Sequence, residues 1–357
     1  MPRFQILTFD GGGIRGAFGV GFLEEIESRL GRGVRDSFGL IAGTSTGAIT
    51  ALGLGIGRSG ADLVEFYNQF GKEIFTQQPA YEPPQMMLKH LYGVVHAIVE
   101  NSSDADIDHF FRPRYSSETL RESLEAGFHD LQMKDISGPR VIVPSINLTT
   151  GSPHVFGTPH LPMHLSDAEL RIVDVLMATT AAPTYFPHHV MPNGDAYVDG
   201  GLWASSPSLL GLAESLRMRQ LCVGDHCAPP FSTKEIFLLN IGTGSIKYSL
   251  TPPSADVGSL FWAQHVADLM MSTQVQGQQV PLGFLLADRV KTINFEIPDD
   301  TWKLDSIQHM DDLFRLGREA AKEHFDELHD LFLQHTADPF VPVDETAHDV
   351  PTVRSAL

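Results

Sequence analysis

The sequence predicts an α/β fold in which helices cover both faces of a mostly parallel central sheet, giving a three-layer α/β/α sandwich. The first observation is an apolar run at 4–9, followed by glycines at 11–13 and apolar residues at helical spacing over 18–30. The second is a repeat of this order, with an apolar run at 38–42, a turn at 43–47 and an Ala- and Leu-rich helix after it. Strand–loop–helix units in tandem place their strands side by side and parallel, with the helices as crossovers.

Later segments extend the same pattern. Apolar runs predict further strands at 140–146, 155–156 and 235–240, and helical periodicity returns over 310–333. The pattern breaks at about 72–117, where prolines precede an apolar stretch and a group of acidic residues. We interpret this segment as an insertion over the sheet.

The domain organisation follows from these elements. We expect a single domain over residues 1–335, with its core motifs within 4–245 and the insertion at about 72–117. Residues 255–335 are expected to form a C-terminal helical part of the same domain. The last residues, 336–357, lose the periodicity and are expected to be disordered.

Composition narrows the class of protein. The chain has 357 residues, of which 42% are hydrophobic and 19% charged, so it can bury a large core. Its formal net charge of −19 excludes the broad basic face that binding a nucleic-acid polymer requires, and any lipid contact must be local and apolar. No secretory signal pattern opens the sequence, and no apolar stretch reaches the ~18–20 residues that span a bilayer. We expect a cytoplasmic protein that is soluble or peripheral at the inner membrane.

A candidate nucleophile, Ser45, lies in a Gly-Thr-Ser-Thr-Gly turn between an apolar strand and a helix. This is the context that a G-x-S-x-G elbow requires. The turn is sharp enough to need small residues at Gly43 and Gly47, and it exposes the serine at the positive end of a helix. The alternative is a glycine-rich turn in which the serine is only an N-cap.

A second glycine-rich loop follows the first apolar run and opens the first helix. The backbone N–H groups of Gly11, Gly12 and Gly13 can converge on one point. Next to Ser45, such a nest of donors would form an oxyanion hole. Arg15 is expected to orient this loop or to attract an anionic head group.

The same loop also fits the dinucleotide-binding fingerprint G-x-G-x-x-G, with Gly11, Gly13 and Gly16 as its glycines. That site needs an acidic residue at the end of the second strand, about twenty residues later. Asp36 lies before the second strand rather than at its end. We therefore disfavour dinucleotide binding.

Asp199 is the candidate base for Ser45. It follows the short run at 196–198 and precedes Gly200 and Gly201. The two glycines leave room around the carboxylate. A carboxylate with an ordinary pKa of about 4 is a poor base for a serine hydroxyl, so an Asp base requires a desolvated and preorganised site. The alternative is an ordinary tight turn.

Taken in order, four motifs strongly resemble the patatin-like phospholipase domain, particularly its bacterial members. They are Asp10-Gly-Gly-Gly-Ile-Arg-Gly16, Gly43-Thr-Ser-Thr-Gly47, Ala178-Thr-Thr-Ala-Ala-Pro-Thr-Tyr-Phe186 and Asp199-Gly-Gly201. The resemblance covers roughly residues 4–245 and implies a patatin-like α/β/α sandwich. It also implies a Ser45–Asp199 dyad, an oxyanion hole from the first glycine loop, and hydrolysis of phospholipid acyl esters through an acyl-enzyme.

The resemblance implies that no histidine serves as the base. A His-containing triad is the mechanistic alternative, with His188 or His189 as the first candidates. One departure from the family pattern is Ser205-Ser206-Pro207, where such proteins commonly carry Asn-Asn-Pro. Serine can cap a turn as asparagine does, so we expect the loop to keep its shape.

Bacterial patatin-like proteins of this size also resemble phospholipase effectors of antiphage defence that cyclic nucleotides switch on. The resemblance therefore implies a cyclic dinucleotide activator, sensed within 72–117 or after residue 245, and it allows a homo-oligomer. A function of another class is a scaffold that binds lipid without cleaving it. The retained catalytic residues disfavour that alternative.

Three weaker signals receive plain interpretations. Segment 86–99 is either an amphipathic lid or a buried helix, and its few cations favour the buried helix. The acidic residues at 104–108 lack the glycine and glutamate of a calcium loop. Cys222, Cys227 and His226 lack a fourth zinc ligand at ordinary spacing, and we expect two free thiols. We therefore expect no metal and no cofactor.

Overall fold

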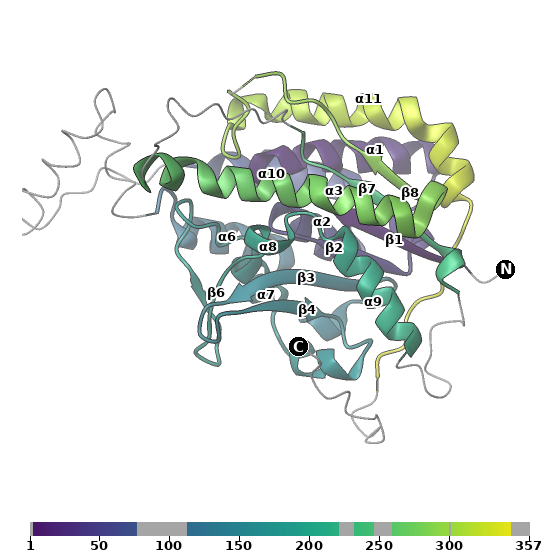
Figure 1. The fold of residues 1–357 in the computed structure, drawn as a ribbon, viewed down its shortest axis with the longest axis horizontal. Helices are drawn as coiled ribbons and strands as arrows, with labels where there is room; N and C mark the ends of the chain where they lie inside the picture. Colours follow the sequence, from purple (N-terminus) through teal and green to yellow (C-terminus); the bar gives the residue numbers. More distant parts are fainter. Residues whose placement is uncertain (1–2, 77–112, 221–231, 246–258, 300, 344–357) are drawn as a thin grey trace, which may run out of the picture.

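The structure is a computed structural model that describes residues 3–76, 113–220, 232–245, 259–299 and 301–343. Within these ranges an eight-stranded sheet forms the centre of the molecule, in the order β5-β6-β3-β2-β1-β7-β8 with β4 paired to β3 (Figure 1). The strands are β1 Phe4–Phe9, β2 Leu40–Gly43, β3 Arg140–Asn147, β4 Ser152–Gly157, β5 His189–Val190, β6 Ala196–Asp199, β7 Ile236–Ile241 and β8 Val290–Ile293.

The sheet is parallel through its middle and antiparallel toward one edge. Strands β3, β2, β1, β7 and β8 pair in parallel, whereas β4 and β6 pair antiparallel with β3, and β5 antiparallel with β6. Every residue of β1 is buried, as expected for a parallel strand that helices cover on both faces. The predicted α/β class with a mostly parallel central sheet is confirmed.

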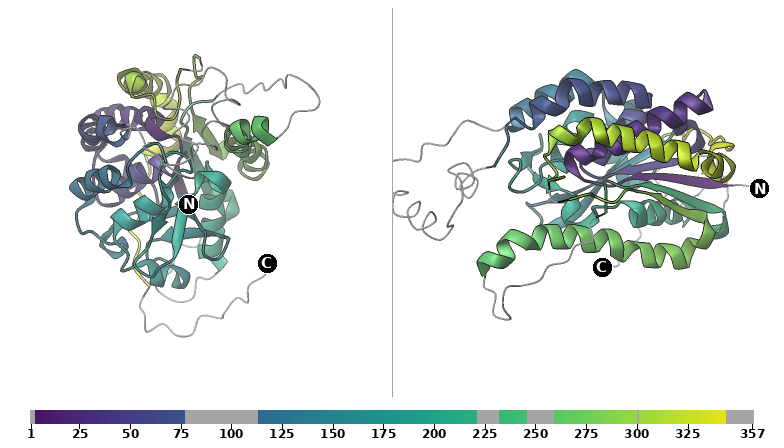
Figure 2. Two further views of the ribbon diagram at one scale, coloured as in Figure 1. Left: turned by 90° about the vertical axis from the view of Figure 1, so that its left-hand side faces the viewer. Right: turned by 90° about the horizontal axis from the view of Figure 1, so that it is seen from above.

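Helices lie on both sides of this sheet (Figure 2). One side carries α1 Ala17–Leu30, α2 Thr46–Gly55, α3 Gly60–Ile74, α6 Ser117–Phe128, α7 Ile172–Thr179 and α11 Met310–Leu328. The other side carries α8 Gly201–Ala204, α9 Ser208–Gln220 and α10 Ser259–Leu286. Short helical turns are η1 Gly13–Gly16, η2 Val34–Ser37, η3 Met133–Asp135, η4 Pro162–Asp167, η5 Thr233–Glu235, η6 Ala287–Arg289, η7 Ile307–His309 and the π-helical η8 His329–Leu333.

Alternate side chains of β1 enter two separate cores. Phe4 and Ile6 belong to the core beneath α9 and α10, whereas Leu7 and Phe9 belong to the larger core on the opposite side. Successive side chains of a strand point to opposite faces, so one strand contributes to both layers of packing. The three-layer arrangement that the sequence predicts is therefore present.

The C-terminal part contributes a strand as well as helices. Helix α11 together with η8 confirms the helical periodicity over 310–333, and α11 lies beside α1 (Figure 1). Strand β8 was not predicted, because Val-Lys-Thr-Ile is too short and too polar to indicate a strand. None of the described helices is long and apolar enough to cross a membrane.

The disordered tail was predicted to begin too early. The backbone N–H groups of Ala337, Phe340 and Val343 donate to carbonyl groups of the domain. Phe340 is also 7% exposed and therefore buried. The chain is held against the domain as far as this segment, because an aromatic side chain and backbone hydrogen bonds anchor it.

The insertion expected at about 72–117 is only partly within the described residues. Helix α3 continues to Ile74, and α6 begins at Ser117, so the insertion joins two helices on the same side of the sheet. The segment 86–99, with its two alternative interpretations, lies outside the described residues.

Candidate active site

Ser45 lies in a tight turn between β2 and α2. Its φ of 54° and ψ of −122° place a residue with a side chain in a rarely populated and strained backbone region. Gly43 and Gly47 make the turn possible, since a Cβ on Gly43 would meet the Gly47 backbone and a Cβ on Gly47 would meet the backbone of Phe9. The turn therefore exposes the serine at the N-terminus of α2, as a nucleophile elbow does.

Asp199 is the hydrogen-bond partner of this serine. Ser45 Oγ donates to Asp199 Oδ2 at 2.6 Å. Asp199 is the last residue of β6, and Gly201 N–H donates to its Oδ1 at 2.7 Å. Gly200 permits the turn, because a Cβ at this position would meet the Pro144 carbonyl. The two residues that the sequence singled out are thus brought together because β3 pairs with β2 on one side and with β6 on the other.

The carboxylate of Asp199 is more basic than an exposed one. The residue is 5% exposed, and burial raises its pKa to about 6 against the lowering effect of the hydrogen bonds from Ser45 and Gly201. Both donors are neutral, so their hydrogen bonds offset only part of the cost of burying a negative charge. A carboxyl group with this pKa is still ionised near pH 7 and accepts a proton more readily than an ordinary aspartate.

The first glycine loop lies beside Ser45, and its hydrogen bonds reduce the number of candidate donors for the predicted oxyanion hole. Gly11 N–H donates to the Ser205 carbonyl at 2.8 Å, so the prediction that Gly11 is an oxyanion donor is wrong. Gly12 and Gly13 line the cavity next to Ser45, and their N–H groups donate to no group among the described residues. Backbone N–H groups beside the serine hydroxyl are the kind of donor that an oxyanion hole uses.

Two further side chains support this loop. Arg15 Nε donates to the Gly12 carbonyl at 3.5 Å, in agreement with the orienting role expected for Arg15. Thr243 Oγ1, in the turn after β7, donates to the Gly11 carbonyl at 2.7 Å. The backbone N–H and C=O groups of Gly11 are therefore both held by distant segments. These contacts fix the position of the loop at Gly12 and Gly13.

A cavity of about 290 Å³ opens beside the Ser45–Asp199 pair. Most of the side chains that line it are apolar, including Ile49, Phe66, Ile74, Phe75, Phe186 and Met271. A concave site with apolar walls and a few polar groups at one place suits a hydrocarbon chain that carries one reactive polar group. A fatty acyl ester has this character.

The segment Ala178–Phe186 serves both the elbow and the cavity. Thr179 Oγ1 accepts from Ser45 N–H at 3.1 Å and donates to the Pro144 carbonyl at 2.7 Å. Residues from Thr180 to Phe186 contribute to the cavity wall. The motif therefore positions the nucleophile and shapes the site at the same time.

The model of the patatin-like phospholipase family matches residues 7–209, more than half of the chain. The chain belongs to the patatin-like phospholipase family. The resemblance drawn from the four motifs is thereby confirmed, and with it the fold class.

Three relatives named cGAMP-activated phospholipase are similar to this patatin-like chain. The protein of Escherichia coli (strain TW11681) is 37% identical over 265 residues, 70% of this chain and 65% of its own length. That of Vibrio cholerae serotype O1 is 34% identical over 266 residues, 71% and 67% of the two chains. That of Pseudomonas aeruginosa (strain BWHPSA011 / Pa011) is 30% identical over 346 residues, 95% and 94% of the two chains. The matched region thus spans about two thirds of the first two relatives and nearly all of the third.

Asp199, rather than a histidine, is the hydrogen-bond partner of Ser45 in this patatin-like site. Among the described residues, no histidine side chain hydrogen-bonds Ser45 or Asp199. His189 Nε2 lies 3.5 Å from Asp174 Oδ1 in α7, and its Nδ1 lies 3.5 Å from the Arg121 guanidinium in α6. No contact among the described residues supports a His-containing triad.

The serine-for-asparagine loop after Asp199 keeps a role in the site. The Ser205 carbonyl receives the Gly11 N–H, and Ser206 Oγ lies 3.1 Å from Ser208 Oγ. Ser208 Oγ lies in turn 2.9 Å from Thr8 Oγ1 in β1. The hydroxyl groups of Ser206 and Ser208 therefore link the loop to the sheet.

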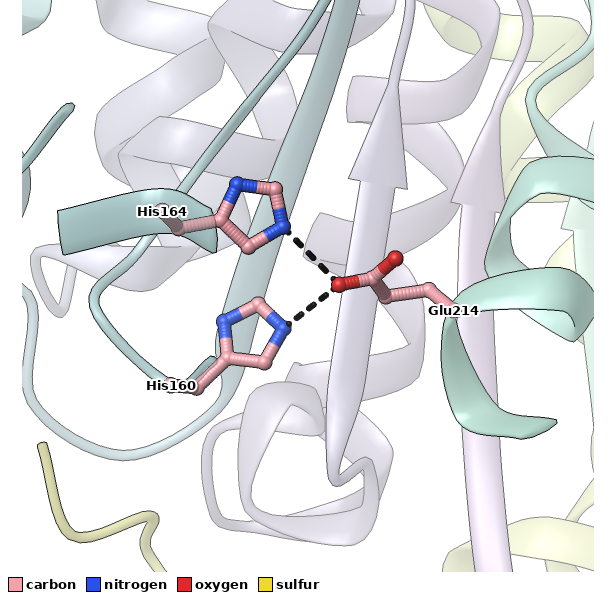
Figure 3. Close-up of side chains that lie close together, drawn as sticks. All are labelled: His160, His164 and Glu214. Carbon is pink, nitrogen blue, oxygen red and sulfur yellow. Dashed lines mark hydrogen bonds and ion pairs between the residues drawn. The ribbon is translucent and has the colours of Figure 1, made fainter. Parts of the chain in front are cut away.

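A second buried polar cluster was missed in the sequence. His160 Nε2 and His164 Nε2 lie 3.1 and 2.9 Å from the same oxygen, Glu214 Oε1, as Figure 3 shows. The other ring nitrogens also have partners, since His160 Nδ1 lies 2.8 Å from Thr158 Oγ1 and His164 Nδ1 lies 3.4 Å from Asp167 Oδ2. No short motif could reveal this cluster, because the glutamate comes from α9 and the histidines from the segment after β4.

The charges of this cluster balance within the protein. Burial opposes a charge on His164, but hydrogen bonds to Asp167 and Glu214 overcome it and raise the pKa to about 9. Burial lowers the pKa of His160 to about 4, so this ring is neutral. Arg217 lies 3.6 Å from Glu214 and supplies a second positive charge for the two carboxylates. Two imidazoles and a carboxylate could bind a divalent metal, but here their contacts make an internal hydrogen-bonded network.

Several weaker sequence signals cannot be compared with the structure. Cys222, Cys227 and His226 lie outside the described residues, as do the acidic residues at 104–108. The expectations of free thiols and of no calcium loop stay predictions.

Proposed function

We propose that this chain is a lipid acyl hydrolase of the phospholipase A type, which cleaves fatty acyl esters of glycerophospholipids. The observation that carries the proposal is the 2.6 Å hydrogen bond from Ser45 Oγ to Asp199 Oδ2 beside an apolar cavity of about 290 Å³. A nucleophile joined directly to its base, next to backbone N–H donors, is what acyl transfer requires.

In the first half-reaction, Ser45 Oγ attacks the ester carbonyl carbon and its proton passes to Asp199 Oδ2. The oxyanion that forms accepts hydrogen bonds from Gly12 and Gly13 N–H. Asp199 then gives the proton to the leaving alkoxide, which departs as the alcohol of the lysophospholipid. The acyl group stays on Ser45 as an ester.

In the second half-reaction, water replaces the alcohol. Asp199 takes a proton from a water molecule, whose oxygen attacks the acyl carbon. When the tetrahedral intermediate collapses, the bond to Ser45 Oγ breaks, the serine takes up the proton from Asp199, and the fatty acid leaves. Gly201 N–H holds Oδ1 of the carboxylate, so Oδ2 stays directed at the serine through both steps.

The charge of the chain supports a particular way of meeting the substrate. With a formal net charge of −19, the protein has no long-range attraction to an anionic bilayer. The apolar cavity instead suits direct transfer of an acyl chain from a lipid surface into the site. We place the enzyme in the cytoplasm, acting as a peripheral protein at the inner membrane.

The proposal includes control by a nucleotide. The alignments with the three relatives named cGAMP-activated phospholipase cover 70%, 71% and 95% of this chain. On that ground we extend a cyclic dinucleotide activator to it. Under this proposal residues 1–335 form one catalytic domain of an antiviral-defence effector, which is kept inactive until the nucleotide binds. A homo-oligomer is compatible with this mode of control.

The test is fatty-acid release from mixed phospholipid vesicles, with and without cGAMP and other cyclic dinucleotides. The parent protein is compared with Ser45→Ala and Asp199→Asn, and with the control variants Ser152→Ala and Asp338→Asn, whose side chains are exposed. We expect release that cGAMP increases, that both site variants abolish and that both controls retain. No release under any condition, together with no labelling of Ser45 by a fluorophosphonate, would overturn the hydrolase proposal. If the parent releases fatty acid at a rate that no nucleotide changes, the proposed regulation by a nucleotide would be overturned, but the hydrolase proposal would stand.

A further inference from the structure

Helix α10 is attached by a glutamine side chain to the loop of residues 202–209, which begins in α8 and ends in the first turn of α9. Gln274 Nε2 donates to the Leu202 carbonyl at 2.6 Å, and Gln274 Oε1 accepts from Ser205 N–H at 3.5 Å. One side-chain amide thus engages both a donor and an acceptor of the loop backbone. The two hydrogen bonds fix both the orientation of the loop backbone and its distance from α10.

A second glutamine, one helical turn later, repeats this arrangement. Gln278 Nε2 donates to the Ser206 carbonyl at 2.9 Å, and its Oε1 accepts from Leu209 N–H at 3.2 Å. Residues four apart lie on the same face of a helix, so the two amides bind neighbouring parts of the loop. Neither glutamine falls within the residues 7–209 that the family model matches.

The loop that α10 holds is where the parts of the active site are joined. The Ser205 carbonyl accepts Gly11 N–H at 2.8 Å, next to the two oxyanion donors. The Ala204 carbonyl accepts Thr44 Oγ1 at 2.7 Å, directly before the nucleophile Ser45. The glycine loop and the elbow are therefore both fastened to the short segment that begins after the base.

We propose that Gln274 and Gln278 are positioning residues, which hold residues 202–209 and through them the glycine loop and the elbow in the arrangement needed for acyl transfer. The position of α10 then sets the rate of the chemical step. The far end of α10 is anchored separately, because Leu282 and Leu286 are buried in the smaller core. This inference rests on the proposed function, since it concerns the same site.

The test replaces each glutamine by methionine, which keeps the side-chain length and the helix propensity but removes both hydrogen bonds. Gln276→Met and Gln279→Met are matched controls, because their side chains are exposed on the same helix. For Gln274→Met we expect kcat on a soluble ester, and the rate of fluorophosphonate labelling at Ser45, to fall by about 10- to 100-fold with little change in KM. Gln278→Met should show a smaller loss in the same direction, and the controls should match the parent.

A purely structural role would lower the melting temperature without separating kcat from KM. Amide exchange, measured by mass spectrometry on peptides covering 9–16 and 200–209, gives a second readout that does not depend on activity. Faster exchange in the Gln274 and Gln278 variants alone supports the proposal, and values equal to those of the Gln276 variant in kcat, labelling and exchange would overturn it. If the parent neither hydrolyses nor labels with or without cGAMP, the proposed function fails, and amide exchange still decides whether α10 positions the loop.

Discussion

Asp199 and Glu214 are buried to almost the same extent, with 5% and 4% of each residue exposed, yet their pKa values shift in opposite directions. Asp199 accepts hydrogen bonds from a hydroxyl and a backbone amide, and burial raises its pKa to about 6. Burial also penalises the charge of Glu214, but hydrogen bonds from His160 and His164 prevail and hold its pKa well below the usual range. Because the two carboxylates are buried to the same depth, the charge of their neighbours determines the direction in which each pKa shifts.

The difference separates the proposed catalytic base, Asp199, from a structural anchor, Glu214. A buried carboxylate with only neutral partners keeps its affinity for a proton, which acyl transfer uses, but its charge destabilises the fold at neutral pH. A buried carboxylate beside an imidazolium loses that affinity and stabilises the fold instead. Neutralising the two residues should therefore have opposite effects on stability and very different effects on activity.

Asp199→Asn should produce the largest change. The amide keeps the size of the side chain but cannot accept the proton of Ser45, so we expect kcat/KM for a soluble ester to fall by a factor on the order of 10⁴. The free energy of unfolding at pH 8 should rise, because the variant no longer buries a charge. Ester hydrolysis and urea denaturation of the same preparation measure both. Lower stability combined with lost activity would mean that Asp199 is an anchor like Glu214.

Glu214→Gln should act in the reverse way. The variant leaves the charge of His164 without its nearest partner, and we expect the free energy of unfolding to fall by about 3 kcal/mol. Activity per folded molecule should stay near that of the parent, because the cluster shares no residue with the cavity beside Ser45. Glu169→Gln is the control, since Glu169 pairs with Lys134 at the surface and its loss should change stability by no more than about 1 kcal/mol. An unchanged midpoint in urea would contradict the structural role of the cluster.

The hydrogen-bonded pair of Ser45 and Asp199, which we propose to be catalytic, could be predicted because each member lies in a short contiguous motif. Ser45 stands in a turn whose glycines are required by local backbone geometry, and Asp199 stands in another. The alternation of apolar runs and helical periodicity was likewise enough for the fold class. These signals are local, and the sequence states them directly.

The features that the sequence did not reveal depend on contacts between distant segments. Gly11 cannot be told from Gly12 and Gly13 by sequence, because only the position of the Ser205 carbonyl removes it from the oxyanion hole. The polar cluster around Glu214 needs a helix and a loop that meet only in the folded chain. Gln274 was overlooked for the same reason, since a glutamine in a long helix is ordinarily a surface residue.

The pH dependence of activity tests the raised pKa of Asp199, with a smaller expected effect than the substitutions of Asp199 and Glu214. Asp199 must be ionised to act as a base. Its folded-state pKa of about 6 predicts that kcat/KM rises with pH through about 6, where it is half the plateau, and levels off above about pH 7. At pH 5 the rate should be about tenfold below the plateau, because one unit below the pKa about a tenth of the carboxylate is ionised. A profile of ester hydrolysis from about pH 4.5 to pH 8 measures this. An inflection near pH 4 would show that burial does not shift this carboxylate.

The pH dependence of stability gives the smallest effect and tests the other cluster. The pKa of His164 is raised from 6.5 to about 9, so its stabilising charge is fully present below about pH 6.5 and is lost as the pH rises through about 9. The free energy of unfolding of the parent should therefore fall over this range, and that of His164→Gln should change less. His160→Gln is the matched control, because burial lowers the pKa of His160 to about 4 and its ring stays neutral throughout. It should keep the alkaline fall of the parent. Equal slopes for the two variants, measured by urea denaturation at a series of pH values, would mean that His164 is not the charged partner of Glu214.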